Sequence, residues 1–141
     1  MSDKNRQFRL KSRPTGRIET GHFDLVEENL PEISDGEALV RTLYLSLDPT
    51  NRIWMSDMDQ YMPPVGIGEV MRGGGIGQVV KSKSARYPEG AIVSGLTGWQ
   101  DYCVADEGAR AMSVLPEGLP PRREPCCRAR ACPVPANRNR R

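Results

Sequence analysis

Short apolar segments, separated by polar residues and turns, run through most of the chain. Phe8 and Leu10 flank a charged residue, and Phe23 and Leu25 repeat this alternation. Further short strands are expected over residues 77–81, 91–96, 101–105 and 111–115, with Gly and Pro residues between them. Many short strands at regular spacing with such turns are typical of a small β-barrel or β-sandwich.

The strongest expected strand covers residues 37–47, EALVRTLYLSL, because apolar residues occupy both of its faces. This pattern predicts burial on both sides. Asp35-Gly36 predicts a turn before the strand, and Asp48-Pro49 predicts its end, since proline lacks the backbone N–H that a sheet requires. The following residues 50–64 have room for one or two helical turns, and their Met and aromatic side chains are expected to pack locally.

A glycine-rich stretch, GIGEVMRGGGIGQVV, covers residues 66–80. Gly73, Gly75 and Gly77 are similar to part of a dinucleotide-binding fingerprint, but Gln78 stands where another glycine is required. That fingerprint also needs a strand before it and a helix after it, so that backbone N–H groups meet the pyrophosphate. Neither is expected here, and the stretch instead predicts a tight bend and a β-bulge in a curved sheet.

The last twenty residues differ in composition from the rest. Residues 1–121 carry 13 Lys and Arg against 17 Asp and Glu, a formal charge of −4, whereas residues 122–141 carry seven Arg and one Glu, a charge of +6. The segment after Pro120-Pro121 has no apolar periodicity, so residues 121–141 are expected to be disordered. Their Arg, Ala, Pro and Cys content is typical of a GC-rich coding strand read out of frame, and we hypothesise a frameshift there.

The composition argues against several classes of protein. A mildly acidic body does not indicate nucleic-acid binding, and no apolar run approaches the roughly 20 residues of a membrane helix. The polar start, MSDKNRQFRLKSR, is unlike a secretory signal, so the expected compartment is the cytoplasm. No metal site is expected, because His22 is the single histidine and the cysteines at 126, 127 and 132 lack zinc-ligand spacing.

Three collinear stretches resemble a known family. LYLSLDPTNRIWM, residues 43–55, is similar to a strand-to-loop segment of the medium-chain dehydrogenase/reductase superfamily, in its leukotriene/prostaglandin reductase and alkenal reductase branch. Residues 67–106, with their glycine bend and Gly-Trp-x-x-Tyr motif, resemble the next segment of that branch. Residues 12–41 are similar to its first hairpins, and the match runs in order from about Gln7 to Pro120.

The resemblance implies a mainly β fold, a GroES-like and partly open β-barrel, as the N-terminal, substrate-side domain over residues 1–120, with no Rossmann domain in this chain. It implies an NADP-dependent oxidoreductase that uses no zinc and reduces the C=C bond of small-molecule α,β-unsaturated aldehydes or ketones. NADPH is implied for the intact enzyme, and none is expected to bind this chain alone. Members of the family are often homodimers.

The same resemblance assigns the substrate-side wall to Asp48, Pro49, Thr50 and Arg52. Thr50 stands where the family has a tyrosine, so a hydroxyl remains but the aromatic ring is lost. The alternatives are that Asp48 only caps the turn and that Arg52 only pairs with a surface carboxylate. Trp99 and Tyr102 are expected nearby, and barrel packing is favoured over substrate contact for both.

A second interpretation is a stand-alone, non-catalytic GroES-like binding module whose basic tail binds an acidic partner. The coding DNA distinguishes the two. A one-base shift after codon 120 that restores a long apolar βαβ pattern with a glycine-rich fingerprint would identify the chain as a truncated reductase.

Overall fold

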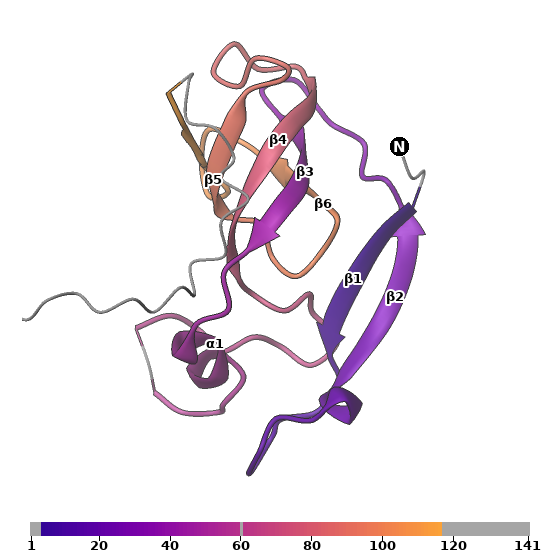
Figure 1. The fold of residues 1–141 in the computed structure, drawn as a ribbon, viewed down its shortest axis with the longest axis vertical. Helices are drawn as coiled ribbons and strands as arrows, with labels where there is room; N and C mark the ends of the chain where they lie inside the picture. Colours follow the sequence, from indigo (N-terminus) through magenta and orange to yellow (C-terminus); the bar gives the residue numbers. More distant parts are fainter. Residues whose placement is uncertain (1–3, 60, 117–141) are drawn as a thin grey trace, which may run out of the picture.

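A computed structural model of the chain describes residues 4–59 and 61–116. Seven β-strands, one α-helix and one short 3-10 helix occupy these residues, and the strands form a two-stranded and a five-stranded sheet (Figure 1). Within these residues the sheets do not close into a barrel. The predicted mainly β, partly open GroES-like fold is confirmed, whereas the predicted tail, residues 121–141, lies outside the described residues.

The two-stranded sheet is an N-terminal hairpin. It pairs β1 (Lys4–Leu10) with β2 (Phe23–Asn29), and the 3-10 helix η1 (Thr20–His22) leads into β2. The hairpin is attached to the larger sheet by Asn5, which is 1% exposed. The Asn5 carboxamide accepts a hydrogen bond from the backbone N–H of Tyr102 and donates one to its carbonyl oxygen, both at 2.9 Å. A buried polar side chain with both ends paired makes this junction specific.

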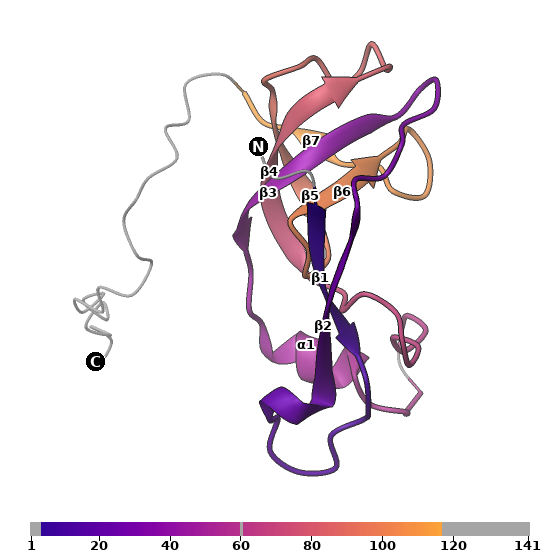
Figure 2. The ribbon, with the colours of Figure 1, turned by 90° about the vertical axis from the view of Figure 1, so that its right-hand side faces the viewer.

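The five-stranded sheet is antiparallel throughout, in the order β6-β3-β4-β5-β7. Its strands are β3 (Ala38–Leu45), β4 (Gly74–Ser82), β5 (Ile92–Leu96), β6 (Tyr102–Ala105) and β7 (Ser113–Val114). Each falls on a segment that the sequence predicted as a strand. Figures 1 and 2 show the helix α1 (Pro49–Trp54) at the opposite end of the molecule from the β4–β5 turn.

Two clusters of buried apolar side chains support these elements. The larger lies on one face of the five-stranded sheet and contains Ala38, Val40, Val79, Tyr87, Val93, Cys103, Ala105 and Met112. The smaller packs α1 against the hairpin and the residues before β4, and contains Leu10, Trp54, Met55, Val65 and Met71. Of the segment 50–64, Trp54 and Met55 thus contribute to local packing as expected, whereas Met58 and Tyr61 are 56% and 73% exposed.

The burial of β3 differs from the prediction. Ala38 to Val40 are at most 2% exposed, but Leu43 and Leu45 are 39% and 42% exposed. The reason is the pairing of β3. It has β6 on one side and β4 on the other over residues 38–41. The Thr42 N–H still donates to the carbonyl oxygen of Asp101 at 2.8 Å, and beyond Thr42 only β4 continues beside the strand. The prediction of burial on both faces along residues 37–47 is therefore wrong for the second half of the strand.

The glycine-rich stretch leads directly into β4. Its pairing with β3 is interrupted twice, where Leu43 on β3 and Val80 on β4 are extra residues, so the predicted bulge is confirmed. Gly77 has no positive φ, and its lack of a side chain serves close packing instead. A Cβ atom at Gly77 would lie 2.8 Å from the carbonyl oxygen of Arg41. Glycine here lets the two strands approach closely.

Candidate functional site

The predicted substrate-side residues lie where β3 leaves the sheet and α1 begins. Asp48 is the N-cap residue of the helix, with extended backbone, and Pro49 is its first residue. Proline suits this position because its fixed φ is already helical and the N–H that it lacks would have no helical partner. The Asp48 carboxylate accepts a hydrogen bond from the Ser46 hydroxyl at 2.7 Å. The capping role considered for Asp48 thus agrees with its place in the structure.

Thr50 lies in the first turn of α1 and is half-buried. Its hydroxyl makes no hydrogen bond within the part of the chain that the structure describes. A hydroxyl group both donates and accepts hydrogen bonds. The side chain is therefore free to bind a polar atom of another molecule.

Arg52 points to the loop before η1 rather than to a carboxylate. Its guanidinium donates to the carbonyl oxygen of Pro14 at 2.7 Å and to that of Gly16 at 3.4 Å, and also to the Ser56 hydroxyl at 2.7 Å. No carboxylate lies within ion-pair distance of Arg52 in residues 4–59 and 61–116. Arg52 consequently ties the loop around residues 13–17 to α1.

An open groove of about 690 Å³ adjoins the start of α1. It runs across the ends of β3, β4 and β5, and its walls include Tyr44, Leu45, Asp48, Ile76 and Leu96. Tyr44, Leu45 and Leu96 are 44%, 42% and 52% exposed. Serine side chains and the Asp48 carboxylate lie beside them, so the groove wall is partly apolar and partly polar. Of the four predicted wall residues, Asp48 alone lines this groove.

Trp99 and Tyr102 take part in packing. The Trp99 ring lies 5.4 Å from the ring of Phe23 and meets the ring of Phe8 edge-on at 6.5 Å. Tyr102 is 2% exposed. Trp99 also lines a second hollow of about 380 Å³ between the hairpin and β3. These positions agree with the packing role that the sequence favoured for both residues.

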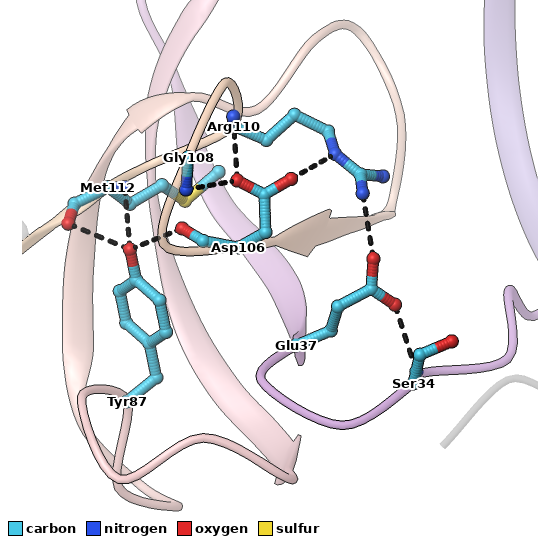
Figure 3. Close-up of polar contacts among 7 residues, drawn as sticks. All are labelled: Ser34, Glu37, Tyr87, Asp106, Gly108, Arg110 and Met112. Carbon is cyan, nitrogen blue, oxygen red and sulfur yellow. Dashed lines mark hydrogen bonds and ion pairs between the residues drawn. The ribbon is translucent and has the colours of Figure 1, made fainter.

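A polar cluster ties residues 106–112 to the start of β3 (Figure 3). The Asp106 carboxylate accepts hydrogen bonds from the backbone N–H groups of Gly108 and Arg110 and from the Arg110 guanidinium, at 2.8–2.9 Å. These bonds, the Arg110 backbone bond first, lower the pKa of Asp106 below its ordinary value of 3.8. Arg110 also donates to Glu37 at 2.8 Å. Because these charges are paired within the cluster, its role is structural.

Cys103 belongs to the larger apolar cluster and is 6% exposed. Burial raises the pKa of its thiol to about 12, against a smaller opposing effect of Arg110. A thiol that stays protonated at neutral pH is a poor nucleophile. Among the described residues, no group of three His, Cys, Asp or Glu side chains could hold a metal ion. No described helix has the length and apolar character to cross a bilayer.

The glycine-rich stretch does not fit the pyrophosphate of a dinucleotide. The end of the glycine-rich stretch lies in β4, which is followed by a turn and β5 rather than by a helix. A Cβ atom at Gly73 would meet the Trp99 indole nitrogen at 2.6 Å, and one at Gly75 would meet the Thr97 side chain. The space beside these glycines is thus filled by the protein itself, and no reaction step is assigned to a cofactor held by these residues.

Comparison with known proteins gives the family. Residues 6–114 match the family described as the N-terminal domain of oxidoreductase. The chain belongs to this family of oxidoreductase domains. It is 45% identical, over 72% of its length, to the NADPH-dependent curcumin reductase of Escherichia coli, and 30% identical, over 82% of its length, to mouse prostaglandin reductase 1. The resemblance to NADP-dependent reductases of the medium-chain superfamily is thereby confirmed.

A solved structure supports the same assignment. The chain superposes on CurA from Vibrio vulnificus, determined in complex with NADPH, with a TM-score of 0.72 and 43% identity over 77% of this chain. The match covers 32% of that protein, and 30% and 32% of the two curated relatives. This oxidoreductase domain therefore spans about a third of the length of the proteins it matches.

Sequence reasoning missed one residue of this region, Asn51, which is 5% exposed and lies inside the turn that carries Thr50. The available signal was the spacing Asp48-x-x-Asn51 at the start of a helix. Such a spacing is that of a capping box, in which the third helical residue bonds back to the N-cap.

Proposed function

We propose that this domain forms the substrate side of an NADP-dependent oxidoreductase that reduces the C=C bond of α,β-unsaturated aldehydes or ketones. The observation that carries the proposal is the match of residues 6–114 to an oxidoreductase N-terminal domain. The names of the relatives add support, because one is an NADPH-dependent curcumin reductase and another a prostaglandin reductase. The complete reaction belongs to an enzyme of their length.

The proposed reaction transfers a hydride to the β-carbon of the substrate and a proton to its α-carbon, and NADPH, which supplies the hydride when bound, becomes NADP⁺. Negative charge develops on the carbonyl oxygen as the hydride arrives, and a hydrogen bond donated to that oxygen lowers the barrier. The Thr50 hydroxyl is a suitable donor, because it has no partner among the described residues. Leu45 and Leu47 precede Thr50 in the chain and are 42% and 75% exposed. Their side chains offer apolar surface to the hydrocarbon part of the substrate.

The test is a completed enzyme. Residues 1–116 of this chain would be joined to the C-terminal two thirds of the Escherichia coli relative, and NADPH oxidation would be followed with a small enal and with a bulky enone. We expect oxidation that depends on both the substrate and this domain. The control is the transplanted part alone, which lacks the substrate side. A chimera that binds NADPH but oxidises it with neither class of substrate refutes the proposed function.

A further inference from the structure

The turn that carries Thr50 is closed by two hydrogen bonds between its ends. The backbone N–H of Asp48 donates to Oδ1 of Asn51 at 2.9 Å, and the backbone N–H of Asn51 donates to the carbonyl oxygen of Asp48 at 2.9 Å. Pro49 lies inside this ring and has a fixed φ. Thr50, the remaining residue of the ring, therefore has little conformational freedom.

The other end of the Asn51 carboxamide anchors the turn to the segment before β4. Its Nδ2 donates to the carbonyl oxygen of Arg72 at 3.3 Å. Arg72 is held in turn by its own side chain, which donates to the carbonyl oxygen of Pro63 at 2.9 Å and lies over the Trp54 ring, 5.5 Å from its centroid. Asn51 thus connects the turn to a segment that is itself bound to the last residue of α1.

We infer that Asn51 is a positioning residue, which sets the direction in which Thr50 presents its hydroxyl to the substrate; this inference rests on the proposed function. Asn51 is nine-tenths buried, and it uses both ends of its side chain. A substitution at position 51 that removes the acceptor leaves the Asp48 N–H unpaired, and one that removes the donor leaves the Arg72 carbonyl oxygen unpaired. Either loss loosens the turn, because an unpaired buried polar group is costly.

The first experiment uses the 141-residue chain and amide hydrogen exchange measured by NMR. Asn51→Leu, similar in shape but without polar atoms, is expected to speed exchange of the Asp48 amide about tenfold, the effect of losing one hydrogen bond. Asn51→Asp keeps the acceptor for the Asp48 amide and loses the donor to Arg72, so exchange of the Asp48 amide should speed up less than in Asn51→Leu. The matched control is Asn29→Leu, at the exposed end of β2.

The second experiment uses the completed enzyme and compares kcat/KM for a small enal and a bulky enone. Asn51→Leu is expected to change the ratio between the two substrates several-fold, because a displaced Thr50 alters the fit of each substrate differently. Asn51→Asp is expected to restore part of the original ratio, and Asn29→Leu to leave it unchanged. A role in folding alone would lower both values by the same factor.

The outcomes separate this inference from the proposed function. Unchanged exchange of the Asp48 amide in Asn51→Leu overturns the inference, whatever the completed enzyme does. An unchanged substrate ratio in Asn51→Leu also overturns it, since the turn then moves without effect on the substrate. A completed enzyme that is inactive with Asn51 intact refutes the proposed function, and the exchange experiment still decides whether Asn51 holds the turn.

Discussion

The close approach of β3 and β4 predicts a large effect of one added methyl group. In Gly77→Ala the new Cβ would lie 2.8 Å from the carbonyl oxygen of Arg41 and would also meet the Val40 side chain. The carbonyl belongs to the backbone of β3, which is paired on both sides, so it cannot turn away as a flexible side chain would. Strand β4 must shift relative to β3 or the ladder between them must distort.

The magnitude follows from two opposing contributions. Overpacking of a well-packed interior costs about 1–3 kcal/mol, and Gly→Ala lowers the entropy of the unfolded chain, which stabilises by about 0.4–1 kcal/mol. Gly77→Ala should therefore destabilise the fold by about 1–2 kcal/mol. Gly16→Ala is the control, because nothing lies within 4 Å of a Cβ there and its φ is not positive. It should be neutral or slightly stabilising.

Urea unfolding followed by tryptophan fluorescence measures both variants, since Trp54 and Trp99 lie in or beside the smaller apolar cluster. A difference of about 2 kcal/mol between Gly77→Ala and Gly16→Ala corresponds to midpoints roughly 1 M apart, for an m-value of about 2 kcal/mol/M. Equal midpoints with equal m-values would show that β3 and β4 do not approach as closely as described, and would refute the reasoning.

Four further outcomes are expected. In a variant whose cysteines at 126, 127 and 132 are replaced by serine, Cys103 should react with a thiol reagent only through unfolding. A pKa near 12 leaves a thiolate fraction about a thousandfold below that of an exposed cysteine. Rapid reaction of the native chain would contradict the burial of Cys103. Asp106→Asn should lower the urea midpoint at pH 7, and this loss of stability should shrink as the pH falls below about 4. The reason is that a carboxyl whose pKa is lower in the folded state stabilises the fold above the unfolded pKa and loses this effect on acidification. A loss of stability that is independent of pH excludes the carboxylate charge as its cause. In the completed enzyme, Thr50→Tyr and Thr50→Ala should change the kcat/KM ratio between a small enal and a bulky enone several-fold, and an unchanged ratio removes Thr50 from the pocket. NADPH fluorescence should stay constant on titration with the 141-residue chain, whereas micromolar saturation would place the cofactor site within it.

Local signals in the sequence were sufficient for the elements of this fold. The alternation around Phe8 and Phe23, the turn at Gly36 and the end of the strand at Asp48-Pro49 all depend on residues a few positions apart. Such short-range preferences decide where strands and helices begin and end. The collinear family motifs then identified the type of domain, and the matched family confirms it.

The proposed substrate-side residues could be predicted only as a segment. Residues 48–52 are contiguous, so the family motif locates them together, but their contacts depend on distant parts of the chain. Arg52 binds the carbonyl oxygen of Pro14, and Asn51 binds that of Arg72. No local sequence pattern predicts hydrogen-bond partners that lie 38 and 21 positions away in the chain. The sequence therefore predicted the segment but could not distinguish the residue that holds the turn from those that it presents.

The sequence by itself determined the positions of the strands along the chain, the room for a short helix after β3 and the oxidoreductase family. The tertiary structure alone decided that β3 lies between β6 and β4 and that its ladder with β6 ends at Arg41. It also decided that Leu43 and Leu45 are exposed in spite of their apolar pattern. The physical reason is that periodicity reports which side chains favour burial, whereas burial itself depends on which strands extend alongside. The tertiary structure also decided that Gly77 serves close packing, since only the pairing of β4 with β3 places the Arg41 carbonyl oxygen against Gly77.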